Sequence, residues 1–203
     1  MKYLVKTPWW LKKLYPNYIW EIPGNEKILY LTFDDGPHET ITSFVLDALR
    51  KYNAKATFFC IGKNVVANPA VFRQIIDEGH AVGNHTFNHV NGWKASNKKY
   101  IDEVFEAAKY IDSNLFRPPY GRISRFQAKV LMQESKRQNI TGRQFNIIMW
   151  SVLSGDFDIS KKANECRDYV ILNTLPGSII VFHDSQKAWE RLQAALPEVL
   201  DYF

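Results

Sequence analysis

The stretch KILYLTFDDGPHETITSFVLDALRKYN, residues 27–53, contains the unit that decides the fold. Its first part, KILYLTF, is a continuous apolar run with the length of a buried strand. Asp34, Asp35 and a Gly-Pro turn end that run, and apolar residues then recur at helical spacing from Ile41 to Leu49. The stretch therefore predicts a strand followed by a helix, with two adjacent carboxylates where the strand ends.

The same strand–helix unit recurs along the rest of the chain. Further apolar runs of strand length are each followed by a segment with helical spacing, namely AKATFFCIG, AVGNH, LFRPPYG, FNIIMWSV and GSIIVFH. The last helical segment contains Pro197, which we expect to kink or split it. Such alternation predicts an α/β fold with parallel strands and outer helices, either an open doubly wound sheet or a barrel.

Composition indicates a single globular domain. The chain has 203 residues, of which 46% are apolar and 23% charged. We expect one domain over residues 1–203, with residues 1–25 as an N-terminal strap. The net charge of +5 permits an anionic partner, such as an acidic glycan. It does not indicate nucleic acid, because the sequence contains no basic stripe, RNP-type motif or Cys/His finger.

The N-terminal stretch MKYLVKTPWWLKKLYPNYIW does not resemble a signal peptide, because it lacks an uninterrupted apolar region and a small-residue cleavage site. No segment has the apolar length of a membrane span. We therefore expect a cytoplasmic protein, or an exported one if a leader has been removed. The stretch mixes Trp, Tyr and Lys as interfacial anchors do, so weak contact with a membrane surface is an alternative. We favour a strap with buried aromatics, because Pro8 and Pro16 leave little helix.

Polar and ionisable side chains follow the predicted strands. The carboxyl ends of parallel strands share one rim, and the chemistry of such folds lies there. We expect one site at this rim, formed by Asp34, Asp35, His85, His89, Arg117, Tyr120, Asp156, His183 and Asp184.

Metal chemistry explains why two carboxylates stand side by side. His85 and His89 are four residues apart in NHTFNH, and on a helical turn that spacing brings both imidazoles to one ion. Two histidines and one carboxylate leave coordination positions open, as in catalytic sites. One aspartate can then bind the ion while its neighbour serves as general base, because the ion's charge offsets their repulsion.

Arg117 and His183 can complete such a site. The guanidinium fork of Arg117 is suited to orient a carboxylate base through two bonds. The imidazole of His183 can give a proton to a leaving group near neutral pH.

The motifs TFDDG, HTFNH, RPPYG and FHD, in this order between about Ile28 and Ser185, resemble the polysaccharide deacetylases with a NodB-homology domain, carbohydrate esterase family 4. The resemblance implies a distorted (β/α) barrel of about seven strands in a single domain. It also implies a divalent metal, usually Zn2+ with Co2+, Ni2+ or Mn2+ as alternatives. The implied substrate is an N-acetylated amino-sugar glycan, such as a chitooligosaccharide or peptidoglycan.

The resemblance also implies a role for individual residues. Asp34 corresponds to the catalytic base, Arg117 to its orienting partner and His183 to the general acid. Tyr120 stands where the family's backbone N–H helps to stabilise the oxyanion. The implied metal ligands are Asp35, His85 and His89, and the residues expected to line the substrate and acetyl pocket are Trp150, Val181, Phe182 and Asp156.

The fourth motif departs from the family. The family commonly has D-x-x-D-W, whereas WSVLSGDFD has Leu153 at the first acidic position and Phe157 in place of Trp. The first aspartate of that motif normally tunes the acid histidine, so we hypothesise that Asp156 or Asp158 takes over this role. We interpret Asp184 as an N-cap of the last helix, with a supporting position behind the site as the alternative.

Three functions follow from these observations. The first is a metal-dependent hydrolase that removes N-acetyl groups from amino-sugar glycans. The second, on the same fold, is an O-acetyl esterase or a hydrolase of non-sugar amides. The third, motivated by the altered fourth motif, is a catalytically weak glycan-binding protein. Two surface features stay open: Trp93 either stacks on a sugar or is a partly buried loop residue, and the polar stretch 133–144 is expected to be solvated.

Overall fold

One curled sheet of parallel strands forms the centre of the fold. The computed structural model describes residues 3–134 and 144–203. In this part of the chain seven strands pair in the order β5-β4-β3-β2-β1-β7-β6, and every pairing is parallel. The strands are β1 (Tyr30–Asp34), β2 (Thr57–Cys60), β3 (Ala81–Asn84), β4 (Leu115–Phe116), β5 (Asn146–Ile147), β6 (Val152–Leu153) and β7 (Ile179–His183). Most of the polar stretch 133–144 lies outside the described residues.

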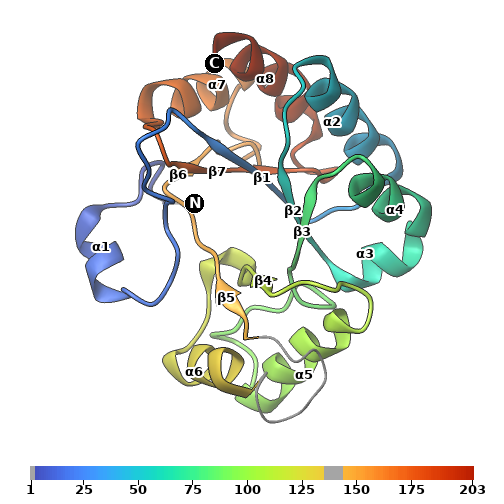
Figure 1. The fold of residues 1–203 in the computed structure, drawn as a ribbon, viewed down its shortest axis with the longest axis vertical. Coiled ribbons are helices and arrows are strands. Elements are labelled where there is room, and N and C mark those ends of the chain that lie inside the picture. Colours follow the sequence, from blue (N-terminus) through green and yellow to red (C-terminus); the bar gives the residue numbers. More distant parts are fainter. Residues whose placement is uncertain (1–2, 135–143) are drawn as a thin grey trace.

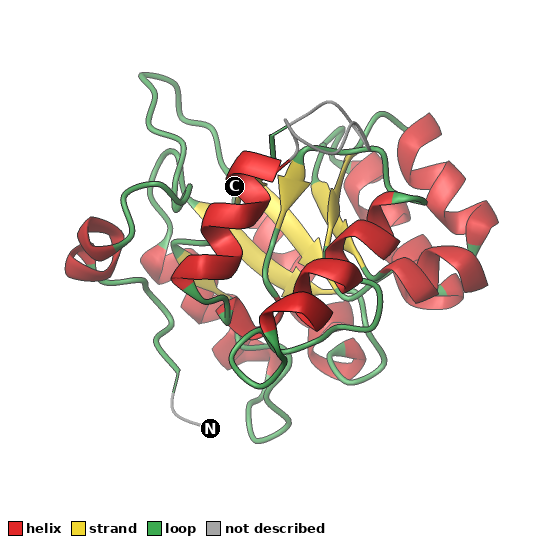
Figure 2. Ribbon diagram, turned by 90° about the horizontal axis from the view of Figure 1, so that it is seen from below, coloured by secondary structure: helices red, strands yellow, loops and turns green. Residues whose placement is uncertain are grey.

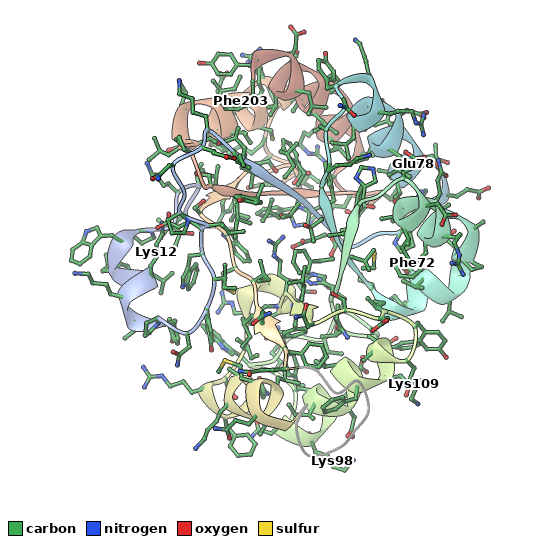
Figure 3. The ribbon with its side chains drawn as sticks, in the orientation of Figure 1. Lys12, Phe72, Glu78, Lys98, Lys109 and Phe203 are labelled. Carbon is green, nitrogen blue, oxygen red and sulfur yellow. The ribbon has the colours of Figure 1, made fainter. Side chains whose placement is uncertain are left out.

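The helices lie outside the curl, as Figures 1 and 2 show, and side chains fill its interior (Figure 3). They are α1 (Trp9–Leu14), α2 (Glu39–Lys51), α3 (Gly62–Ala67), α4 (Pro69–Asp77), α5 (Asn97–Ala108), α6 (Arg125–Glu134), α7 (Ala163–Asn173) and α8 (Trp189–Tyr202), with a short 3-10 turn η1 (Pro119–Gly121). This arrangement confirms the predicted distorted (β/α) barrel as a single domain. Helix α8 continues through Pro197, so the expected splitting of this helix does not occur. None of the helices in the described ranges has the length and apolar character needed to cross a membrane.

The run FNIIMWSV, residues 145–152, does not form the single strand that was predicted. Its beginning is β5, which pairs with β4 at one edge of the sheet, and its end belongs to β6, which pairs with β7 at the other edge. Both ends of the run are buried, so the apolar pattern is the same as that of one continuous strand. The chain therefore passes from one edge of the curled sheet to the other within this run.

The N-terminal segment covers the opening between these two edges. The N–H of Ile19 donates to the carbonyl of Ile147 at 2.9 Å, and the N–H of Met149 donates to the carbonyl of Ile19 at 2.7 Å. Further along the opening, the N–H of Leu153 donates to the carbonyl of Val5 at 2.8 Å. These bonds satisfy backbone groups that an uncovered strand edge would leave unpaired.

Side-chain alternation along the strands separates the core from the rim. Phe33 in β1 and Phe182 in β7 are fully buried, stack at a ring distance of 6.1 Å and belong to the core packed under α2, α7 and α8. Successive side chains of a strand point to opposite faces. Asp34 and His183, which follow them and are paired in register, therefore face the interior of the curl at its carboxyl rim.

Candidate active site

Asp34 is a buried carboxylate held by a buried arginine. Its exposed fraction is 4%, whereas Arg117, which directly follows β4, is fully buried. Nη1 of Arg117 donates to Oδ1 of Asp34 at 2.7 Å and to the hydroxyl of Thr32 at 2.7 Å. Thr32 lies two residues before Asp34 on the same face of β1, so one strand supplies both acceptors.

The rest of the Arg117 guanidinium is fixed by the chain that crosses the opening. Nε donates to the carbonyl of Ile148 at 3.3 Å and Nη2 to the carbonyl of Met149 at 3.0 Å, while the guanidinium lies 4.1 Å from the ring centre of Phe59. The expected two-bond fork is therefore not formed, because only Nη1 reaches Asp34. Burial lowers the pKa of Arg117, and the carboxylate of Asp34 opposes that effect. The ion pair fixes the Asp34 carboxylate in one orientation.

Asp35 points away from its neighbour because the backbone turns at this residue. Its φ is 82°, a conformation that costs energy for a residue with a side chain. The amide of Asn64 donates to the carbonyl of Asp35 at 2.7 Å and supports this turn. The two adjacent carboxylates therefore have different neighbours: Asp34 contacts an arginine, and Asp35 contacts two histidines.

His85 presents an unprotonated nitrogen to Asp35. Its Nδ1 lies 2.7 Å from the carbonyl of Arg117, and because a carbonyl only accepts, this nitrogen carries the proton. The lone pair of Nε2 then faces Asp35, with 3.7 Å between Nε2 and Oδ1. Burial lowers the pKa of His85 to about 4, so the ring is neutral near pH 7.

The histidine pair does not lie on a helical turn, so that prediction was wrong. The residues after β3 form an irregular turn in which Thr86 has φ 63° and His89 has φ 57°. The turn still brings the two rings within 5.0 Å of each other and places Nε2 of His89 3.2 Å from Oδ1 of Asp35. Positive φ values at Asp35, Thr86 and His89 concentrate backbone strain around one point, as functional sites often do.

Asp35, His85 and His89, the metal cluster hereafter, fit a divalent cation. One ligand atom from each residue lies within 4.8 Å of the others. Oδ1 of Asp35 is buried and has no hydrogen-bond partner, an arrangement that a bound cation would satisfy. Burial opposes ionisation of Asp35, but the imidazoles of His89, His183 and His85 outweigh it and lower the pKa of this carboxyl well below its usual range. A charged carboxylate and two imidazole nitrogens are ligands that bind zinc with open positions remaining.

His183 faces the metal cluster from β7 and is held by Asp156. Nδ1 of His183 lies 2.7 Å from Oδ1 of Asp156, and the backbone N–H of His183 donates to Oδ2 of Asp156 at 2.7 Å. Burial would lower the pKa of His183, but the carboxylate of Asp156, with smaller effects of Asp35 and Asp34, raises it to about 9. The imidazole is therefore protonated near neutral pH, as a general acid requires.

Asp156 does not line a substrate pocket, contrary to expectation. It is fully buried, and both of its carboxylate oxygens bind His183. Asp158, the other candidate for this contact, is half-buried and binds Ser160 instead. Leu153 lies buried in β6, and the ring of Phe157 packs edge-on against His183 at 5.1 Å. The position of Asp156 supports the hypothesis that it tunes His183.

Of the three apolar residues expected to line the acetyl pocket, Val181 and Trp150 lie on the side of the sheet that carries the site, and Phe182 does not. Phe182 faces the core on the opposite side of the sheet, so its assignment to the acetyl pocket was wrong. Val181 lies two residues before His183 in β7. Because side chains alternate along a strand, the two residues face the same side of the sheet. Trp150 is half-buried, with its ring centre 6.0 Å from the guanidinium carbon of Arg117.

Tyr120 lies over the metal cluster from the next loop. Its φ is 60°, in the 3-10 turn η1, and its side chain is 59% exposed. The rings of Tyr120 and His89 are 4.6 Å apart. The turn after β4 thus meets the turn after β3 at the candidate metal site.

Asp184 is buried and binds the turn that follows β1. Its interpretation as an N-cap of the last helix was wrong. Helix α8 begins five residues later, at Trp189. The carboxylate of Asp184 instead accepts bonds from the N–H of Gly36 and the hydroxyl of Thr42. Arg191 is a second support that was not anticipated, since its Nε donates to the backbone carbonyl of Asp156 at 2.6 Å. The position of Asp184 directly after His183 was the one sequence signal for either residue.

The curled parallel barrel and its Asp-His-His cluster define the chain as a metal-dependent hydrolase of the carbohydrate esterase type. Residues 21–142 match the family model described as polysaccharide deacetylase. A peptidoglycan-N-acetylglucosamine deacetylase of Bacillus cereus is 36% identical over 187 residues, covering 89% of this chain and 84% of the relative. A chitooligosaccharide deacetylase of Azorhizobium caulinodans is 34% identical over 170 residues, covering 80% of this chain and 76% of the relative.

A solved structure shows the same relationship. The crystal structure of the Bc1960 peptidoglycan N-acetylglucosamine deacetylase superposes with a TM-score of 0.78 at 32% identity, covering 95% of this chain and 86% of that one. The chain belongs to the polysaccharide deacetylase family.

Proposed function

We propose that this chain hydrolyses the acetamide group of N-acetylated amino sugars in a glycan. The observation that carries the proposal is the unpartnered Oδ1 of Asp35 facing two imidazole nitrogens at the rim that also holds Asp34 and His183. The names of the relatives, which specify peptidoglycan and chitooligosaccharides, support an amino-sugar substrate for this chain.

The metal cluster would hold the ion, with zinc as the expected metal because it binds histidine and carboxylate in open catalytic sites. When bound, the ion would polarise the acetamide carbonyl as a Lewis acid and lower the pKa of water, which makes that water a better nucleophile. The remaining chemistry belongs to side chains and backbone groups of the chain.

Asp34 takes the proton of the attacking water. Its carboxylate is held by Nη1 of Arg117 at 2.7 Å, which fixes the direction in which it can accept that proton. Negative charge then develops on the acetamide oxygen, and the backbone N–H of Tyr120 donates to that oxygen.

His183 completes the reaction by giving its proton to the amine nitrogen as the C–N bond breaks. The products are acetate and a free amino sugar. The contact with Asp156 keeps His183 protonated and fixes the ring so that Nε2, and not Nδ1, is the donor. Trp150 and Val181 contribute apolar surface near these groups for the methyl group of the acetyl.

The test is acetate release from N-acetylglucosamine oligomers by protein that has been chelated and then reloaded with zinc. We expect release that depends on the metal and that Asp34→Asn abolishes. Asp47→Asn is the matched control, because Asp47 is an exposed carboxylate on α2 that pairs with Arg50 away from the rim. Zinc-dependent release from acetylated xylan but not from N-acetyl oligomers would replace this proposal by the O-acetyl esterase.

A further inference from the structure

We propose that Trp93 and Arg122 form a second sugar-binding subsite beside the metal cluster, and that this subsite takes a sugar bearing a carboxylate. The inference rests on the proposed function, because it concerns the sugar next to the one that is deacetylated. The substrate would then be an acidic glycan of the peptidoglycan type rather than a neutral chitooligosaccharide.

Trp93 is an exposed aromatic residue whose position is fixed. Its exposed fraction is 61%, yet its indole N–H donates to the carbonyl of Ile123 at 3.2 Å and its backbone N–H donates to Oδ1 of Asn91 at 3.0 Å. The guanidinium of Arg122 lies 4.1 Å from the ring centre. A rigid, exposed indole offers a face on which a sugar can stack without a large loss of side-chain entropy.

The two loops that carry this pair are bound to each other. The N–H of Gly92 donates to the carbonyl of Arg122 at 3.1 Å, and the amide of Gln127 donates to the carbonyl of Gly92 at 2.9 Å. The approach requires glycine, because a Cβ at position 92 would lie 2.4 Å from the carbonyl oxygen of Arg122. Trp93 and Arg122 therefore form one preorganised surface.

This surface is adjacent to the metal cluster. Arg122 is two residues from Tyr120, whose ring lies 4.6 Å from that of His89, and Trp93 is four residues from His89. Two residues of chain span at most about 7 Å and four about 14 Å. Both loops follow carboxyl ends of neighbouring strands, so the pair lies on the rim where the acetamide is hydrolysed.

The charge around this surface favours an anion. The ranges 89–101 and 117–133 contain no Asp or Glu. Of their basic residues, Arg117 is paired with Asp34 and Lys98 with Asp102, which leaves Lys94, Lys99, Arg122, Arg125 and Lys129 to set the charge of this surface. Within the described part of the chain, no carboxylate forms an ion pair with Arg122. Lys98 projects from the outer surface of α5 in Figure 3.

A carboxylate is the anion that fits this pair best. The guanidinium of Arg122 lies over one face of the Trp93 indole, so its edge can bind a carboxylate through two parallel hydrogen bonds while the other face of the indole packs on the sugar. The lactyl group of N-acetylmuramic acid provides such a carboxylate directly on a sugar ring. Oligomers of N-acetylglucosamine contain no charged group before deacetylation, so they would use Trp93 but not Arg122.

The experiment compares kcat/KM for acetate release by the zinc-loaded protein on three oligomers. The first is a neutral N-acetylglucosamine tetramer, the second an alternating tetramer with N-acetylmuramic acid, and the third the same alternating tetramer with its carboxylates converted to amides. We expect the wild type to prefer the acid over the amide by about tenfold. Arg122→Gln should remove this preference for the acid over the amide, whereas Arg122→Lys should retain part of it.

Trp93→Ala should raise KM for all three oligomers by about tenfold, because stacking does not depend on charge. Trp9→Ala and Arg73→Gln are the matched controls, since both residues are exposed and lie on α1 and α4, away from the rim. Equal kcat/KM for acid and amide in the wild type, or an unchanged preference in Arg122→Gln, would overturn the subsite while the deacetylase stands.

If no oligomer releases acetate, the proposed function fails and the subsite is judged by binding. The affinities of the zinc-loaded wild type and of Arg122→Gln for the acid and amide tetramers are then measured by calorimetric titration. A preference for the acid that requires Arg122 would support the subsite, and equal binding of both tetramers by both proteins would overturn it.

Discussion

Asp184 accepts a hydrogen bond of 3.0 Å from the backbone N–H of Gly36, the residue directly after Asp35. The other carboxylate oxygen accepts from the hydroxyl of Thr42 at 2.5 Å, and the N–H of Asp184 donates to the carbonyl of Asp34 at 3.1 Å. A Cβ at position 36 would lie 2.0 Å from Oδ2 of Asp184, so only glycine permits this contact. The residue after the acid histidine thus holds the turn that carries the base and the metal ligand.

Asp184 makes the stability of the protein depend on pH. Burial raises the pKa of Asp184 from 3.8 to about 7, so the folded state favours the protonated form. The stability that this preference contributes is full below about pH 4 and is lost as the pH rises through about 7. Between pH 5 and pH 8 the metal-free wild type should lose about 1–3 kcal/mol more than Asp184→Asn, measured by urea denaturation. Parallel pH profiles for the two proteins would contradict this role.

Asp156 sets the pH above which the acid fails. His183 acts protonated, and the carboxylate of Asp156 raises its pKa, so activity should decline as the pH rises through that pKa. Asp156→Asn removes the charge that raises the pKa, and the alkaline limb of kcat/KM should move to lower pH by about one unit or more. Asp158→Asn is the control, because Asp158 binds Ser160 and not His183. An alkaline limb that stays in place in Asp156→Asn would show that another group tunes the acid.

Arg117 is predicted to be essential for stability as well as activity. Removing its guanidinium leaves the carboxylate of Asp34 buried without a charge partner, and breaking such a pair costs about 3–5 kcal/mol. We expect a loss of that size for Arg117→Met in the free energy of unfolding measured with urea. The double variant Asp34→Asn/Arg117→Met leaves no unpaired charge and should recover part of the loss. A double variant as unstable as the sum of the single ones would mean that the two residues do not act as a pair.

The sequence predicted the location of the site because that location depends only on the strands being parallel. Parallel strands end at one rim, so Asp34, His85, Arg117 and His183 had to meet there whatever the details of the loops. The order of the strands and the curl of the sheet could not be read in this way. β4, β5 and β6 are two residues long, too short for an apolar pattern to separate them from buried loops.

The errors within the site have a common origin in backbone geometry. The spacing of His85 and His89 suggested a helix, but positive φ values at Thr86 and His89 bring the rings together without one. Phe182 was assigned to the pocket by its proximity to His183, although adjacent residues of a strand face opposite sides. The contact of Asp156 with His183 depends on a loop conformation, and its sequence position allowed Asp158 equally well.

The adjacent aspartates should separate cleanly by experiment. Asp35 faces two imidazole nitrogens, whereas Asp34 is bonded to Arg117, so only the first belongs to the metal cluster. Asp35→Asn should weaken zinc binding by about 100-fold or more, since it removes the only charged ligand, and acetate release should fall with occupancy. Asp34→Asn should bind zinc with nearly the wild-type affinity and release no acetate even when fully loaded. Competition with a chromogenic chelator measures the affinities, and metal analysis confirms the loading. Equal loss of zinc from both variants would mean that the two carboxylates share the ion, and the base would then have to be another group.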